Sequence, residues 1–263
     1  MTAHPSRVPD RQFEPWQPST AEPFDHRRLC HLLRRTSFGV SADRLRANKE
    51  KTVTEVIDSV LDCDMRSDPF EVAAEQLEGF VNFREVGSVA SYWFYRMINS
   101  PQPIQERIAL FCHEHWATGS AKVNDGRLMH QQIQTFRRLG LGNFRELAVA
   151  MGRDPAMLIW LDGQYNRKGK ANENYGREVM ELFTLGIGNY TEHDIREGAR
   201  AFTGWAHDGE EFVFRKFDHD DGIKTFFGRS GNFNGNDILE IILQDPVCAK
   251  YISGKLFKFF AYD

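Results

Sequence analysis

Two short motifs and one helix carry the side chains best suited to chemistry in this sequence. The first motif is His113-Glu114-His115, near the end of a helix expected over residues 103–116. Imidazole groups beside carboxylates are common ligands of zinc and iron. Because helical residues two apart point about 200° away from each other, both imidazoles reach one ion only if the helix ends before His113. The alternative is one hydrogen-bonded core histidine and one histidine on the polar face.

A helix expected over residues 175–185 carries the second group of polar side chains. Glu178 lies at the edge of the apolar stripe of this helix, beside Val179. A carboxylate at the boundary of a core must be paired or neutral. Glu178 is therefore either a metal ligand or acid/base group, or one half of an ion pair. We predict that Glu178 is at least half buried and contacts one of five residues: Arg196, Arg200, His113, His115 or His219.

The third group, His219-Asp220-Asp221-Gly222, is expected to form the turn of a β-hairpin. Apolar runs flank it at residues 212–214 and 223–227. Asp and Gly favour turns for conformational reasons alone, whereas His219 beside two acids also suits metal binding or general-base catalysis. The resulting hypothesis assigns catalysis to Glu178 and His219. It assigns a divalent metal ion to His113, His115, Glu178 and His219.

The elements around these residues predict a mainly α protein, a multi-helix globular domain with one short β-hairpin. Apolar residues recur with helical spacing over most of the chain, and Ser41, Ser88, Asn143 and Thr191 stand where helices would be capped. We expect residues 24–263 to form the helical domain. Residues 1–23 contain five prolines and are expected to form a disordered or extended arm. Because the chain stops directly after an apolar helix, we also expect C-terminal truncation or a partner.

Helical periodicity also predicts which apolar side chains are mostly buried. The Leu182→Ala substitution is expected to cost about 2–5 kcal/mol, as for other large-to-small changes in a core. The residues predicted to be buried are Leu29, Leu33, Val56, Ile57, Val60, Ile108, Phe111, Val179, Leu182, Phe183, Phe202 and Leu256.

Composition and motif content exclude several classes of function. The formal net charge of -4 gives no global basic field, so we expect no nucleic-acid partner. No apolar run is long enough to span a membrane, and the N-terminus has no secretory signal, which predicts a cytoplasmic protein. None of the four cysteines forms a CxxC pair, so a thiolate zinc site is not expected. Nucleotide-binding, serine-hydrolase and HExxH motifs are absent from the sequence.

Six segments carry a resemblance to a known family. They are HLLRRTSFG (residues 31–39), ERIALFCHEHWATGSAKV (106–123), LGNFREL (141–147), DPAMLIWLDG (154–163), NENYGREVMELFTLGIGNYTEHDIREGARAFTGW (172–205) and HDDGIKTFFG (219–228). Together they resemble the bacterial domain of unknown function 1800 family, from about residue 29 to residue 260. The resemblance implies a helical protein without an assigned activity. Members of that family are often exported, often longer, and often found beside a sulfatase-like protein.

Two functional hypotheses follow. The first is a helical binding or scaffold protein that partners a sulfatase-like protein, with its polar residues serving as helix caps and ion pairs. The alternative is a metal-dependent, hydrolase-like enzyme in which a bound ion activates water at a His/carboxylate site. The positions of three side chains distinguish the two hypotheses, because the enzyme needs His113, Glu178 and His219 in one pocket.

Overall fold

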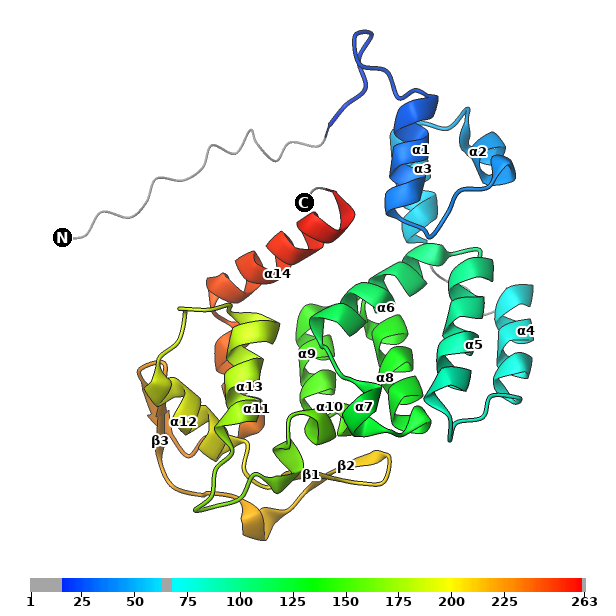
Figure 1. The fold of residues 1–263 in the computed structure, drawn as a ribbon. Coiled ribbons are helices and arrows are strands. Elements are labelled where there is room, and N and C mark those ends of the chain that lie inside the picture. Colours follow the sequence, from blue (N-terminus) through cyan, green and yellow to red (C-terminus); the bar gives the residue numbers. More distant parts are fainter. Residues whose placement is uncertain (1–15, 63–67, 262–263) are drawn as a thin grey trace, which may run out of the picture.

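The computed structural model describes residues 16–62 and 68–261, and it is mainly α-helical, as predicted. Three N-terminal helices form a small group at the top of Figure 1, set above the larger body. Their apolar side chains form a separate cluster that packs on Ile104 and Phe260 of that body. These helices are α1 (His26–Arg35), α2 (Ala42–Asn48) and α3 (Val53–Leu61).

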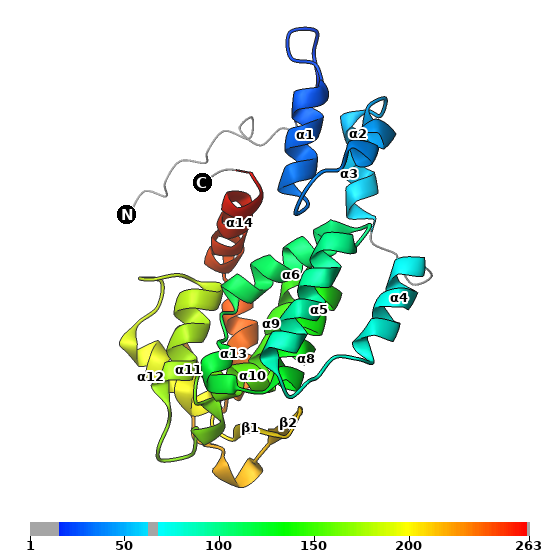
Figure 2. The ribbon, with the colours of Figure 1, turned by 45° about the vertical axis from the view of Figure 1, so that its right-hand side comes forward.

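The middle of the chain forms the helical body that holds the main core. In this body α6 and α8 pack closely against each other, and α5 packs on both, whereas α4 lies at the outer edge beside α5 (Figures 1 and 2). The helices are α4 (Pro69–Glu78), α5 (Val86–Asn99), α6 (Pro103–His115), α7 (Ser120–Val123), α8 (Gly126–Leu139), α9 (Phe144–Gly152) and α10 (Pro155–Trp160).

The last third of the chain completes the main core and adds two small β-hairpins, one at the lower edge of Figures 1 and 2 and the other at the left side of Figure 1. Its elements are η2 (Gly163–Tyr165), α11 (Glu173–Glu178), η3 (Val179–Thr184), α12 (Glu192–Ala201), β1 (Trp205–Asp208), β2 (Glu211–Phe214), η4 (Lys216–Asp218), β3 (Lys224–Phe226), β4 (Arg229–Gly231), α13 (Gly235–Leu243) and α14 (Pro246–Phe260). No helix in the described ranges is long and apolar enough to cross a lipid bilayer.

Several predicted helix starts are confirmed by their capping bonds. The side chains of Ser41, Asn143 and Thr191 each accept a backbone N–H from the first turn of the helix that follows. The predicted cap at Ser88 is wrong, because α5 already begins at Val86. Residues 1–15 of the predicted arm lie outside the described residues, whereas Trp16 packs against Phe24, with ring centroids 6.5 Å apart.

The predicted pairing of the hairpin is wrong, although strands occupy both predicted segments. β2 pairs with β1 and β3 pairs with β4, in two separate antiparallel sheets. The turns lie at Gly209, with φ +58°, and at Phe227-Gly228, with φ +47° and +71°. Glycine adopts positive φ with little strain, which suits Gly209 and Gly228 to these turns. The segment from His219 to Gly222 is therefore the loop between two hairpins, and not the turn of one.

Most of the predicted core is buried, with two exceptions. Leu182 and Ile57 are 44 % and 38 % exposed, so the prediction is wrong for both, while Leu256 is only partly buried. For Leu182 the reason is local. Residues 179–184 form a π-helix, which advances by more residues per turn than an α-helix. Leu182 is thereby rotated out of the stripe that still buries Val179 and Phe183.

Candidate functional site

His113 and His115 point away from each other because α6 remains helical through His115. The His113 ring packs against Trp93 and Phe136, with centroid distances of 5.5 and 6.3 Å. Its Nδ1 is buried and has no hydrogen-bond partner among the described residues. The helix therefore does not end early enough to let both imidazoles bind one ion.

His115 lies on the core side of α6, where both ring nitrogens have partners. Nε2 is 2.9 Å from the carbonyl oxygen of Phe183, and Nδ1 is 3.0 Å from Nζ of Lys255. An ammonium group only donates, so Nδ1 accepts from Lys255 and Nε2–H donates to Phe183. Burial and, after it, the neighbouring Lys255 charge lower the pKa of His115, and the bond to Phe183 O offsets part of this effect. The resulting pKa is about 4. The imidazole is therefore neutral near pH 7.

Lys255 and Tyr251 connect α14 to this histidine and to η3. The Lys255 ammonium lies 5.1 Å from the centre of the Tyr251 ring, and burial lowers the pKa of Lys255. The Tyr251 hydroxyl donates to the carbonyl oxygen of Leu182 over 3.0 Å. Two successive carbonyls of η3, those of Leu182 and Phe183, thus receive side chains from α14 and α6.

The π-helix itself explains why those carbonyls are available to side chains. Leu185 N donates to Met180 O over 2.8 Å, and the Thr184 hydroxyl donates to Val179 O over 2.6 Å. Widened turns of this kind release carbonyl groups and are frequent at functional sites. Gly186 ends the segment with φ +80°, and a Cβ there would stand 2.9 Å from the Tyr251 ring. Glycine is therefore required both for the turn and for the approach of Tyr251.

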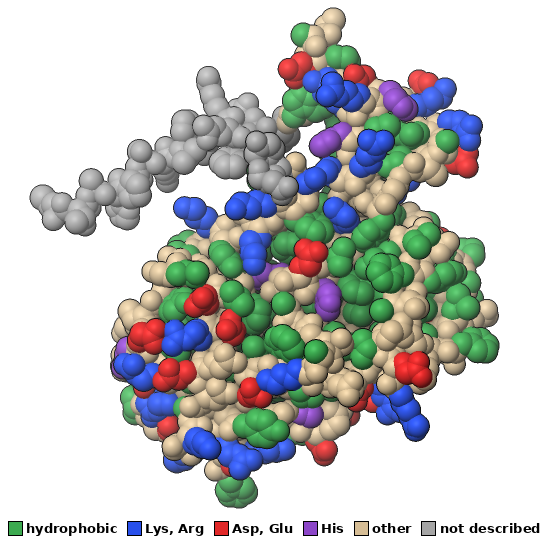
Figure 3. All heavy atoms as spheres, in the orientation of Figure 1, with side chains coloured by type: hydrophobic (Ala, Val, Ile, Leu, Met, Phe, Trp, Pro, Cys, Tyr) green, Lys and Arg blue, Asp and Glu red, His purple; other side chains and the backbone are tan. Residues whose placement is uncertain are grey.

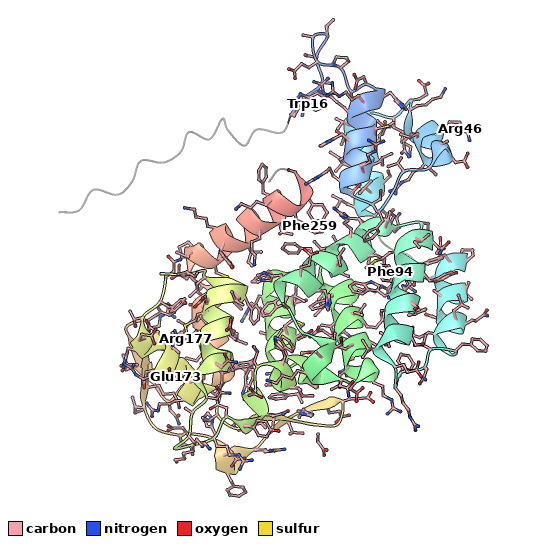
Figure 4. All side chains as sticks on the ribbon, in the orientation of Figure 1. Trp16, Arg46, Phe94, Glu173, Arg177 and Phe259 are labelled. Atoms are coloured by element: carbon pink, nitrogen blue, oxygen red, sulfur yellow. The ribbon has the colours of Figure 1, made fainter. Side chains whose placement is uncertain are left out.

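Glu178 lies at the junction of α11 and η3, and its predicted contact is wrong. Its carboxylate forms no hydrogen bond or ion pair with any described residue, although the side chain is partly buried. Burial and the nearby Glu181 carboxylate raise the pKa of Glu178, and Arg177 offsets part of that effect. Arg177 itself pairs with Glu192 at 2.9 Å and lies 3.8 Å from Glu173, its neighbour in Figure 4.

Glu181, in η3, acts on two tyrosines, Tyr190 and Tyr251. It accepts a hydrogen bond from the Tyr190 hydroxyl; burial and this bond raise the pKa of Tyr190 to about 12. The charge of Glu181 also contributes, after burial, to the raised pKa of Tyr251. We refer to His115, Lys255, Tyr251, Glu181 and Glu178 as the η3 cluster, a group of ionisable side chains around η3.

His219 lies apart from this cluster, in the loop between the hairpins. It is buried; its Nδ1 is 2.8 Å from Thr203 O, and its ring packs edge-on against Phe214 at 5.2 Å. The following Asp220 binds Arg200 over 2.8 Å, and this bond lowers the pKa of Asp220 to about 2. These contacts hold the loop on α12, so His219 and Asp220 have structural partners.

The four predicted metal ligands therefore occupy separate places. His113 faces α5 and α8, His115 faces η3 and α14, Glu178 lies at the end of α11, and His219 lies against Thr203. Within residues 16–62 and 68–261 no three His, Cys, Asp or Glu side chains are arranged to hold a metal ion.

Sequence reasoning did not find a buried charge network in the helical body. The Glu106 carboxylate is fully buried and accepts from Nε of Arg96 at 3.0 Å, Nε of Arg137 at 2.8 Å, and Nε1 of Trp93 at 3.0 Å. Arg96 also binds both oxygens of Glu71 on α4. A cavity of about 480 Å³ opens beside Arg96 and Arg137. The partners come from four different helices, so helical periodicity in one sequence gives no signal for the network.

Comparison with known proteins assigns the chain to a family. The family described as Protein of unknown function (DUF1800) matches residues 31–263, and the chain belongs to it. This confirms the resemblance carried by the six segments. No curated protein and no solved structure matches the chain.

Proposed function

We propose that this member of the family is a helical binding or scaffold protein whose partner is a sulfatase-like protein. The observation that supports this proposal is an apolar stripe on the outer side of α5. Phe94 and Ile98 are 62 % and 76 % exposed, and they lie one helical turn apart on the same face. Large side chains exposed together in this way mark interaction surfaces more often than isolated ones do.

The stripe leads into a hollow suited to receiving an apolar anchor. A cavity of about 540 Å³ lies between the end of α5 and the loop after α1. Its apolar lining includes Phe38, Val40, Met97 and Ile98. Partner side chains that enter such pockets supply most of the affinity of protein interfaces. Figure 4 labels Phe94, the exposed residue of this surface nearest the middle of α5.

The proposal is tested by binding of the purified chain to the sulfatase-like protein. Isothermal titration with the native chain should give saturable binding, and a Phe94→Glu/Ile98→Glu variant should weaken it by at least roughly tenfold, as expected for loss of central anchors. Phe80→Glu/Ile187→Glu is the matched control, because both side chains are more than 80 % exposed elsewhere on the protein. Equal binding by both variants would contradict the α5 surface, and no binding by the native chain would contradict the partner.

A metal-dependent hydrolase is the alternative function, and one observation favours it. Nδ1 of His113 is buried without a partner among the described residues, and a bound ion is one way to satisfy such a nitrogen. Metal analysis of the purified protein tests this alternative. A stoichiometric divalent ion that is lost in His113→Ala would support the hydrolase, and a metal-free protein that binds its partner would support the scaffold.

A further inference from the structure

Two neighbouring surface loops outside these sites carry several basic side chains and one fully exposed aromatic ring. Phe217, at the centre of η4, is fully exposed. Arg215 and Lys216 precede it and are also exposed. A single exposed apolar side chain is common on protein surfaces. The combination of a fully exposed ring with neighbouring cations is the feature that points to a partner.

A second loop adds three more cations beside this ring. Arg167, Lys168 and Lys170 are all exposed. Lys168 N donates to Asp218 O over 2.7 Å, so the backbone of this loop is bonded directly to η4. Arg167 also forms an ion pair with η4, because its Nε lies 4.0 Å from Oδ2 of Asp218.

Both loops are held in place by bonds to the body of the protein. Gly204 N donates to Asn166 O over 2.9 Å, and Arg215 N donates to Gly204 O over 2.7 Å. Asn166 is buried, and its side chain binds Ala199 O of α12 at 2.8 Å. The five cations and Phe217 are thus presented on a fixed backbone. We call Arg167, Lys168, Lys170, Arg215, Lys216 and Phe217 the basic tip.

We propose that the basic tip docks on an anionic lipid surface, with Phe217 inserted among the headgroups. The net charge of the chain is -4, so the local excess of cations is not a by-product of a basic protein. Cations around an exposed aromatic ring are the usual composition of a peripheral membrane anchor. Figure 1 shows η4, the orange turn between β2 and β3, at the lower extremity of the ribbon, and Figure 3 shows Lys and Arg side chains gathered along that edge.

The shape of the tip favours a bilayer over a nucleic acid. Single-stranded nucleic acids bind in grooves whose cations follow the backbone and whose aromatic rings stack on bases. Phe217 is instead fully exposed in the short turn η4. That turn lies at the lower edge of the ribbon in Figures 1 and 2. A projecting ring needs a deformable surface to bury itself, and a lipid headgroup layer provides one.

Vesicle sedimentation of the full chain tests the proposal. The protein should bind phosphatidylcholine vesicles that contain phosphatidylserine, and bind pure phosphatidylcholine vesicles at least roughly tenfold more weakly, since each cation near an anionic bilayer strengthens binding by roughly fivefold. Lys168→Glu/Lys216→Glu should abolish binding. Lys49→Glu/Lys51→Glu changes the net charge equally at two exposed lysines of the N-terminal helix group and should leave binding unchanged.

The contribution of the ring is measured separately. Phe217→Ala should weaken binding by roughly tenfold, because an inserted phenylalanine contributes through its buried apolar area. Phe80→Ala removes another ring, 86 % exposed, and should have no effect. Three results would each overturn the proposal. They are equal binding to both kinds of vesicle, equal loss of binding in the two lysine variants, and binding of single-stranded RNA in place of vesicles.

Discussion

Lys255 Nζ lies 3.0 Å from Nδ1 of His115, although 140 positions separate the two residues in the chain. The bond joins α14 to α6, and the opposite nitrogen of the same ring joins α6 to Phe183 of η3. One neutral imidazole thus connects three elements of the main core. Because a protonated ring can no longer accept from Lys255, this connection depends on pH.

The first prediction concerns the protonation of His115. Its folded-state pKa is about 4, below the usual 6.5, so the unfolded chain binds the proton first. The stability contributed by the neutral ring is complete above about pH 6.5 and is lost as the pH falls toward 4, by about 3 kcal/mol in all. NMR titration should show one imidazole that stays neutral at pH 5.5.

The Lys255→Met substitution is the control for this assignment. The Lys255 charge is the second cause of the lowered pKa of His115, after burial, so its removal should raise that pKa without restoring it to 6.5. A His115 ring that titrates near 6.5 in the native protein would contradict its burial, and an unchanged pKa in Lys255→Met would contradict the Lys255–His115 bond.

The second prediction compares two neighbouring residues of η3. Leu182 is 44 % exposed and Phe183 is 1 % exposed. Leu182→Ala should therefore cost less than about 1 kcal/mol, whereas Phe183→Ala should cost about 3–5 kcal/mol through the cavity that it leaves. Urea denaturation of both variants measures the difference. Equal costs would indicate a regular α-helix over residues 179–184.

Leu182 also shows where prediction from the sequence ends. Apolar spacing predicted a mainly helical chain and the burial of Val179 and Phe183, because spacing reports which face is apolar when the helical period is constant. The π-turn changes that period, and the contacts that hold it come from His115 and Tyr251, far away in sequence. A single sequence does not reveal such tertiary contacts, so the exposure of Leu182 was not predictable from it.

The candidate site was predicted in one respect only. Helical geometry correctly predicted that His113 and His115 diverge on a regular helix, and the structure keeps α6 regular. The partners of His115 were not predictable, because no periodic feature of α14 marks Lys255 as a donor. The same limit explains why the partners of Glu106 were not predictable from the sequence.

The third prediction concerns Glu106. This carboxylate is fully buried and holds the guanidinium groups of Arg96 and Arg137. Glu106→Gln should destabilise the fold by about 3–5 kcal/mol, because two cations lose their shared counter-charge in a buried place. Thermal unfolding of this variant measures the loss. Glu240→Gln removes one side of a more exposed pair with Arg145 and should cost at most about 1 kcal/mol.

The last prediction concerns Glu178, whose charge has no partner among the described residues. Burial and the Glu181 carboxylate raise its pKa, so the folded protein favours the protonated form. The stability that this form contributes is present below the usual pKa of 4.5 and is lost as the pH rises through the folded-state value. At pH 7 the charged carboxylate therefore opposes folding, and Glu178→Gln should leave stability unchanged within about 0.5 kcal/mol or increase it.

Glu192→Gln makes the same chemical change where the pKa shift has the opposite sign. Its bond to Arg177 lowers the pKa of Glu192, so the charged form is favoured in the folded protein and its removal should not stabilise the fold at pH 7. Denaturation of both variants at pH 7 and pH 4 compares the two carboxylates. Any gain from Glu178→Gln should shrink at pH 4, because the native side chain is then largely protonated. A marked loss of stability in Glu178→Gln at pH 7 would instead mean that Glu178 holds a cation, and would favour the metal-dependent enzyme over the scaffold.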